Sequence, residues 1–130
     1  MEYGDFVSNK NKIAVVGATE NRSKWGYKVF KALMESGFDA VPVNPKYESV
    51  EGKICSKDIS SLNGNVDLVI FVVPPKVTEQ IACQVVEKGI KKAWIQPGSE
   101  SKKAIETLEE GGVKVVFNAC FVVDGLRKRI

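Results

Sequence analysis

Short apolar runs alternate with stretches of helical periodicity along almost the whole chain, and this alternation restricts the fold more than any other feature. Five runs rich in β-branched residues predict strands, at residues 12–17, 38–43, 67–73, 92–96 and 113–118. Apolar residues spaced three or four apart predict helices, over residues 24–36, 77–86 and 100–110. Strands joined by helical crossovers run parallel, with helices on both faces of the sheet. We therefore predict an α/β fold, a Rossmann-like doubly wound parallel sheet of five strands in the order 3-2-1-4-5.

Prolines and polar residues mark the ends of the predicted strands. The run at 67–73 (Asp-Leu-Val-Ile-Phe-Val-Val) is the strongest strand pattern, and Pro74-Pro75 ends it. Asn44-Pro45 ends the second strand, because proline cannot donate to a strand ladder and disfavours helix at the residue before it. Residues 46–65 are polar and contain Gly and Ser, so we predict a loop there, with one helical turn near 58–62.

Length and charge limit the organisation of the chain and its partners. With roughly 150 residues to a domain, the 130 residues predict one domain, 1–130, with a core from about residue 10 to residue 123. Lys and Arg number 19 against 16 Asp and Glu, a net charge of +3. This excess is too small and too dispersed for a dedicated nucleic-acid binder. It suits a compact anionic small molecule.

No segment has the pattern of a membrane span or a signal peptide. The longest apolar run is 68–73, far short of the roughly 20 residues that cross a bilayer. Residues 1–5 are acidic and have no apolar core. Cys55, Cys83 and Cys120 are an odd number without paired spacing, which disfavours a disulfide scaffold. We expect a reduced, cytoplasmic protein.

The sequence contains no histidine, and this shortens the list of possible chemistries. Ser-His and Cys-His nucleophile pairs, most zinc sites and phosphohistidine relays all need that side chain. We therefore expect no catalytic residue and no metal ligand, and no enzyme activity from the chain on its own.

Candidate ligand-binding residues follow the predicted strands, because ligands of such sheets bind outside the carboxyl ends of the strands. The candidates are Gly17, Ala18, Thr19, Asn21, Arg22 and Lys24 after the first strand, Asn44, Pro45 and Lys46 after the second, Val73, Pro74 and Pro75 after the third, Gln96, Pro97 and Gly98 after the fourth, and Asn118 and Cys120 after the fifth.

The first of these loops does not match the dinucleotide fingerprint G-x-G-x-x-G. Ala18 and Thr19 follow Gly17, and the next glycine is Gly26. A loop that leads into a helix still offers unpaired N–H groups and a positive dipole end to a phosphate. We favour phosphate binding here over the alternative, an ordinary helix entry capped by Ser23 or Asn21.

The loop after the second strand separates the possible cofactors. An NAD site places Asp or Glu there to bond the ribose hydroxyls, whereas this chain has Asn44-Pro45-Lys46. A lysine suits a ribose phosphate, either the 2′-phosphate of NADP or the 3′-phosphate of coenzyme A. A solvated surface lysine is the alternative.

Four motifs together resemble a known family. They are Ile13-Ala14-Val15-Val16-Gly17-Ala18-Thr19, Val41-Pro42-Val43-Asn44-Pro45-Lys46-Tyr47, Val73-Pro74-Pro75 and Trp94-Ile95-Gln96-Pro97-Gly98. Over residues 10–123 the chain is similar to small stand-alone CoA-binding domain proteins, and to the N-terminal CoA-binding domain of the succinyl-CoA synthetase α subunit and of ADP-forming acyl-CoA synthetases. Those synthetases carry phosphate on a histidine of a second domain, so the resemblance does not extend to their phosphoryl relay.

The resemblance implies a ligand and a role for each loop. CoA would lie across the carboxyl edge of the sheet, with its pyrophosphate at Thr19 to Arg22 and its ribose phosphate at Lys46. Val73 to Pro75 would form an apolar wall beside the adenine or the pantetheine. Gln96 to Gly98 would bond the pantetheine amides.

Some side chains could either contact the ligand or pack in the core. Cys120 could approach the CoA thiol and form a mixed disulfide, but a small buried thiol is the commoner role of a free cysteine. Trp25, Tyr27 and Tyr47 could stack on adenine or pack in the core.

Three functions stay open on the sequence. We favour a non-catalytic CoA- or acyl-CoA-binding protein that acts as carrier, sensor or subunit. The others are an NADP-linked or cysteine-based oxidoreductase, and an oligomerising scaffold. A partner enzyme is possible, as is a homodimer formed through an apolar edge strand.

Overall fold

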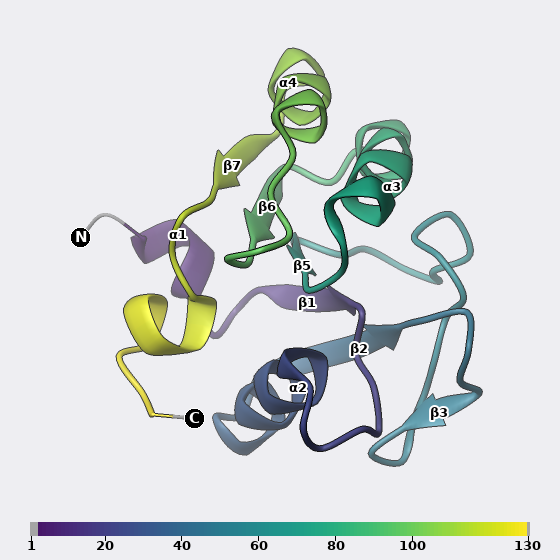
Figure 1. The fold of residues 1–130 in the computed structure, drawn as a ribbon, viewed down its shortest axis with the longest axis vertical. Coiled ribbons are helices and arrows are strands. Elements are labelled where there is room, and N and C mark those ends of the chain that lie inside the picture. Colours follow the sequence, from purple (N-terminus) through teal and green to yellow (C-terminus); the bar gives the residue numbers. More distant parts are fainter. Residues whose placement is uncertain (1–2, 130) are drawn as a thin grey trace.

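The computed structural model describes residues 3–129, so residues 1, 2 and 130 of the predicted domain, including the start of the acidic segment 1–5, lie outside the described residues. The strands are β1 (Lys12–Val16), β2 (Asp39–Val43), β3 (Ser49–Val50), β4 (Lys53–Ile54), β5 (Leu68–Phe71), β6 (Lys92–Ile95) and β7 (Lys114–Val116). The helices are α1 (Gly4–Val7), α2 (Trp25–Glu35), α3 (Pro75–Glu87), α4 (Lys102–Glu110) and a π-helix, η1 (Phe121–Gly125). All five predicted strands and all three predicted helices are present (Figure 1).

The predicted α/β class and the parallel five-stranded sheet are confirmed, but the predicted strand order is wrong. The sheet runs β2-β1-β5-β6-β7, and each neighbouring pair is parallel. In the numbering of the five predicted strands this is 2-1-3-4-5 in place of 3-2-1-4-5. The reason is burial, because every residue of β5 is fully buried. Such a strand belongs inside the sheet, whereas the predicted order would place it at an edge.

The segment between β2 and β5 explains the difference. It forms a small β3–β4 hairpin and pairs with β2 only at a parallel bridge between Val43 and Ser56. Ser56 thus lies where the third strand of a 3-2-1-4-5 sheet would run. Its neighbours are polar and lack a β-branched run, so the pairing does not extend into a strand.

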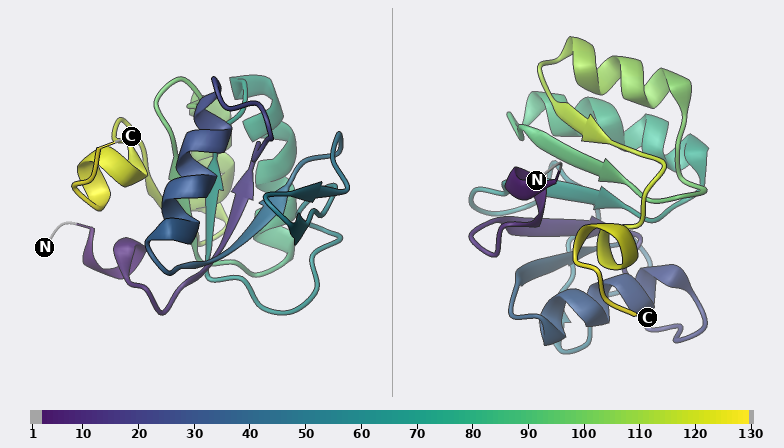
Figure 2. Two further views of the ribbon diagram at one scale, coloured as in Figure 1. Left: turned by 90° about the horizontal axis from the view of Figure 1, so that it is seen from below. Right: turned by 90° about the vertical axis from the view of Figure 1, so that its left-hand side faces the viewer.

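The sheet is covered on both faces, which the side-chain alternation of β1 makes clear. Ile13 and Val15 pack in a core with α1, α2 and η1. Ala14 and Val16 pack in a second core with α3 and α4. Figure 2 shows α2 on one side of the sheet and α3 with α4 on the other. The fold is therefore a three-layer arrangement, in which every helix that follows a sheet strand starts at the carboxyl edge.

The end of the described chain closes the α2 side of the molecule. Trp94 on β6 is fully buried, and its indole N–H donates to the carbonyl of Ala119 over 2.8 Å. Its ring meets those of Tyr3, Phe6 and Phe121 edge to face.

Within residues 3–129, no helix has the length and apolar character needed to cross a membrane.

Candidate functional site

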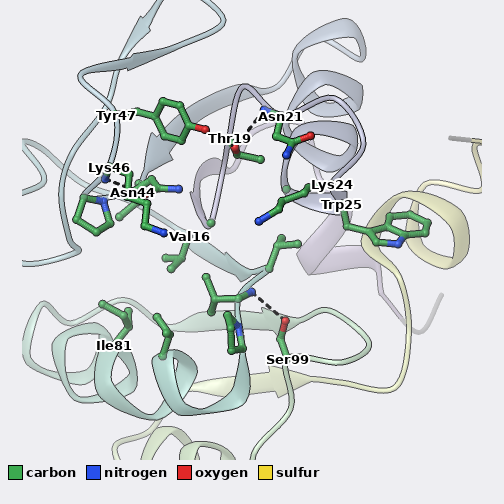
Figure 3. Close-up of a pocket in the computed structure, with 18 of the residues that line it drawn as sticks. Val16, Thr19, Asn21, Lys24, Trp25, Asn44, Lys46, Tyr47, Ile81 and Ser99 are labelled. Carbon is green, nitrogen blue, oxygen red and sulfur yellow. Dashed lines mark hydrogen bonds between the residues drawn. The ribbon is translucent and has the colours of Figure 1, made fainter.

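A pocket of about 970 Å³ opens at the carboxyl edge of the sheet, where β1 and β5 lie side by side. The chain leaves β1 toward α2 on one face and leaves β5 toward α3 on the other. Crossovers that depart in opposite directions leave a crevice between them, the usual ligand site of doubly wound sheets. Figure 3 shows Thr19, Asn21 and Lys24 along one side of this pocket and Ile81 and Ser99 along the other.

Two glycines allow the first loop to lie close to the sheet. Gly17 has φ +101°, and a Cβ there would lie 2.1 Å from the carbonyl oxygen of Val72. Gly26, in the first turn of α2, packs so tightly that a Cβ would lie 2.0 Å from the carbonyl oxygen of Gly17. In the dinucleotide fingerprint the third glycine serves the same close packing of helix on strand. Gly26 thus supplies this contact at a longer spacing, which the motif comparison missed.

The loop between these glycines presents donors to the pocket. Asn21 donates its backbone N–H to the Thr19 hydroxyl over 3.1 Å, which holds the turn. Lys24 stands before α2 without capping it through its side chain. Within residues 3–129, the backbone N–H groups of Trp25 and Gly26 have no acceptor. Unpaired N–H groups at a helix start favour an anion.

Asn44 fixes the loop after β2 through both ends of its side-chain amide. Its amide nitrogen donates to the carbonyl of Ala18 over 2.9 Å, and its amide oxygen accepts from the backbone N–H of Lys46 at the same distance. An NAD site would place a ribose-binding carboxylate at this strand end. Here the position instead ties two loops together, which disfavours NAD.

The charge of the pocket has one sign. Lys24, Lys46 and Lys57 line it, and no Asp or Glu is among the described residues that do so. The ammonium of Lys24 points toward the middle of the pocket in Figure 3. Three cations without a compensating carboxylate make a site for a ligand with several negative charges.

The opposite wall is apolar and rests on Ser99. Val72, Val73, Pro74, Val77 and Ile81 form this wall. The buried Ser99 hydroxyl accepts the backbone N–H of Val73 over 3.0 Å, and its carbonyl accepts the Thr78 hydroxyl over 2.8 Å. The turn after β6 therefore positions the apolar wall, which runs from the end of β5 into the first turns of α3.

Replacing Ser99 by alanine should loosen this wall. The change removes the acceptor of the Val73 N–H, and we expect it to lower the free energy of unfolding by about 1 kcal/mol, since water in the pocket can replace part of the lost bond. Urea denaturation of the Ser99→Ala variant would measure the loss. A Ser60→Ala variant is the matched control, because it changes an exposed hydroxyl that makes no hydrogen bond within residues 3–129, and equal losses in both would contradict the role of Ser99.

The structure brings most of the candidate residues together. The candidates that line the pocket are Gly17, Thr19, Asn21, Lys24, Asn44, Pro45, Lys46, Val73, Pro74, Pro97 and Gly98. Of the aromatic candidates, Trp25 and Tyr47 line it, and Tyr27 does not. That these residues bind CoA stays a prediction.

The other candidates do not face the pocket. The candidates that do not line the pocket are Ala18, Arg22, Pro75, Gln96, Asn118 and Cys120. Ala18 is fully buried in the core, Arg22 lies 5.7 Å from the Tyr27 ring centre, Pro75 begins α3, and Asn118 is exposed with φ +63°.

Gln96 and Cys120 turn inward together. Gln96 donates to the Cys120 sulfur over 3.3 Å and accepts the backbone N–H of Phe121 over 2.7 Å. Both side chains are buried. The structure therefore gives Cys120 the packing role, away from the pocket.

Several lining residues are not among the candidates chosen from the sequence. They are Val16, Ser23, Gly26, Val43, Lys57, Val72, Val77, Gln80, Ile81 and Ser99. The lining residues in the first turns of α3 could have been predicted from the sequence, because a helix that follows a strand at the carboxyl edge presents its start to the crevice. Lys57 had none, since it belongs to the irregular segment after β4.

The pocket carries no metal-binding cluster. Across residues 3–129 there is no group of three or more His, Cys, Asp or Glu side chains that could hold a metal ion. Separately from any metal site, the Cys55 thiol donates to the backbone carbonyl of Asn44, and burial raises the pKa of this thiol.

The fold and the pocket define a Rossmann-like domain with a crevice lined by lysines at the carboxyl edge of its sheet. The family model described as "CoA binding domain" matches residues 11–125, so the chain belongs to that family. It is 35% identical to the α subunit of the ADP-forming acetate–CoA ligase II of Pyrococcus furiosus, over 89% of this chain and 28% of that subunit.

Proteins of similar length are also similar to this chain. An uncharacterized protein of Bacillus subtilis is 25% identical, over 94% of this chain and 90% of its own length. A solved structure of a conserved hypothetical protein from Pyrococcus furiosus is 45% identical, with a TM-score of 0.83 over 87% of this chain and 97% of that one. The predicted resemblance to CoA-binding domains is thus confirmed.

Proposed function

We propose that the protein binds coenzyme A or an acyl-CoA in the pocket at the carboxyl edge and does no chemistry on it alone. The observation that carries this is the composition of the pocket, with three lysines and no carboxylate on one side and an apolar wall on the other. CoA has the matching character, since phosphates occupy one half of the molecule and a long neutral arm the other. The pocket volume of about 970 Å³ is in the range typical of cofactor sites.

Each part of the pocket suits one part of this ligand. The pyrophosphate would lie at the start of α2, against Thr19, Asn21 and Lys24. The ribose 3′-phosphate would lie at Lys46. The apolar arm or the adenine would follow the wall from Val73 to Ile81.

The non-catalytic role is supported by the side chains that the chain offers. Its 130 residues contain no histidine, and the pocket-lining residues include neither a carboxylate nor a cysteine. A carrier, a sensor or the CoA-binding part of a larger assembly fits this set. In the last case a partner enzyme, or a second copy of the chain, would supply the reacting groups.

Calorimetric titration with CoA, acetyl-CoA, NADP and NAD tests the proposal. We expect CoA and acetyl-CoA to bind and NAD to show no heat of binding. Preference for NADP would overturn the proposal and favour the oxidoreductase. Incubation of the protein with acetyl-CoA should release no thiol beyond the rate in buffer, and release above that rate would contradict the non-catalytic role.

A further inference from the structure

Three consecutive residues of the first loop are each bonded to the segment after β2. The carbonyl of Ala18 accepts from the Asn44 amide over 2.9 Å, and the hydroxyls of Thr19 and Tyr47 share a hydrogen bond of 2.8 Å. The carboxylate of Glu20 accepts the backbone N–H of Glu51 over 3.2 Å. These bonds join the 44–51 segment to the pocket loop residue by residue, and they are called the clasp below.

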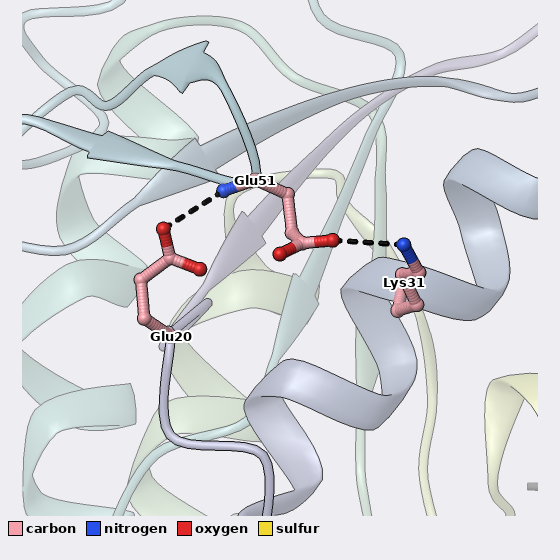
Figure 4. Close-up of polar contacts among 3 residues, drawn as sticks. All are labelled: Glu20, Lys31 and Glu51. Atoms are coloured by element: carbon pink, nitrogen blue, oxygen red, sulfur yellow. Dashed lines mark hydrogen bonds and ion pairs between the residues drawn. The ribbon is translucent and has the colours of Figure 1, made fainter.

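The far end of the clasp is held in an unfavourable conformation. Glu51 has φ +50°, in the left-handed region, where a side chain other than Gly, Asn or Asp is rarely found. Its carboxylate pairs with Lys31 of α2 over 2.9 Å, and this contact keeps the pKa of Glu51 below its usual range. Figure 4 shows Glu51 between Glu20 and Lys31. A two-residue hairpin loop of type I′ requires positive φ at both of its central residues, and Glu51 with Gly52 (φ +79°) forms that loop between β3 and β4.

Glu20 makes the clasp informative about function. It is the only carboxylate in the first loop, residues 17–24, and it is exposed and does not line the pocket. A negative charge beside a site for a polyanion should weaken binding. The structure gives it a compensating task, because its carboxylate holds the loop that presents Thr19, Asn21 and the start of α2.

We propose that Glu20 is a positioning residue, which holds the anion-binding loop in its binding conformation through the clasp to residues 44–51. This inference rests on the proposed function. The two possible roles of Glu20 predict opposite changes in CoA affinity when Glu20 is replaced by alanine. If its charge alone matters, Glu20→Ala tightens CoA binding. If it positions the loop, the same change weakens binding, by about two- to tenfold for one lost hydrogen bond.

The test compares CoA dissociation constants across matched variants. We expect Glu20→Ala to weaken binding and Glu20→Gln, which keeps an acceptor oxygen, to restore most of it. Glu48→Ala is the control, because Glu48 is also an exposed carboxylate near the pocket and makes no side-chain hydrogen bond within the described residues. Unchanged or tighter binding by Glu20→Ala would overturn the inference while leaving the proposed function intact. Absence of CoA binding by the wild-type protein would overturn both.

Two further measurements separate positioning from general loss of stability. Without ligand, Glu20→Ala should speed backbone amide exchange in residues 18–23 and leave the exchange of β5 and β6 unchanged. Tyr47→Phe and Thr19→Val each remove one hydroxyl of the middle bond, so their double mutant should weaken CoA binding less than the product of the single effects. Equal exchange in wild type and Glu20→Ala, or independent effects of the two hydroxyls, would contradict the clasp.

Discussion

Replacing Gly26 by alanine should destabilise the protein by about 2 kcal/mol and weaken CoA binding, because α2 would have to move away from the first loop. The added Cβ would lie 2.0 Å from the carbonyl oxygen of Gly17, a backbone atom that cannot swing aside like a side chain. Forced overpacking costs about 1–3 kcal/mol even where side chains can adjust. Alanine favours helix over glycine by about 1 kcal/mol, so the clash should outweigh the gain in propensity.

Urea denaturation and a CoA titration of the same variant would measure both effects. Gly4→Ala is the matched control, because Gly4 also lies in a helix and an added Cβ there would meet no atom within 4 Å. We expect that control to unfold like the wild type. A Gly26→Ala variant as stable as the control would contradict the close packing of α2 on β1.

Replacing Lys46 by alanine should weaken CoA binding by about 1–3 kcal/mol, roughly 5- to 150-fold, and leave dephospho-CoA binding nearly unchanged. The expectation follows from the proposed contact with the ribose 3′-phosphate. A charge-assisted bond of this kind is lost only for the ligand that carries the phosphate. The measurement is a dissociation constant for each ligand with wild type and variant.

Lys103→Ala provides the control for net charge, because Lys103 is exposed on α4 and does not line the pocket. We expect it to lower the affinity for both ligands slightly and equally. Equal losses for CoA and dephospho-CoA in Lys46→Ala would mean that the lysine contacts another part of the ligand. The neighbouring Lys57 would then become the candidate for the 3′-phosphate.

About half of the residues that line the site were predictable from their place after the strands. Gly17, Thr19, Asn44 and Lys46 could be chosen because parallel strands end at one edge, whatever their order in the sheet. The same reasoning failed for Gln96 and Cys120. Each follows a strand, yet their side chains turn into the core and satisfy one another and the N–H of Phe121. Sequence position alone does not state which way a side chain at a strand end points.

By itself, the sequence determined the class of the fold, the extents of its main helices and strands, and the edge that carries the pocket. These follow from local patterns, since hydrophobic periodicity and Gly or Pro breaks act within a few residues. Tertiary structure decided the position of β5 in the sheet, the pairing of Ser56 with β2 and the arrival of Lys57 at the pocket. It also decided the clasp between Glu20 and Glu51. Those features depend on contacts between residues far apart in the chain, whose choice rests on burial and packing that no local pattern records.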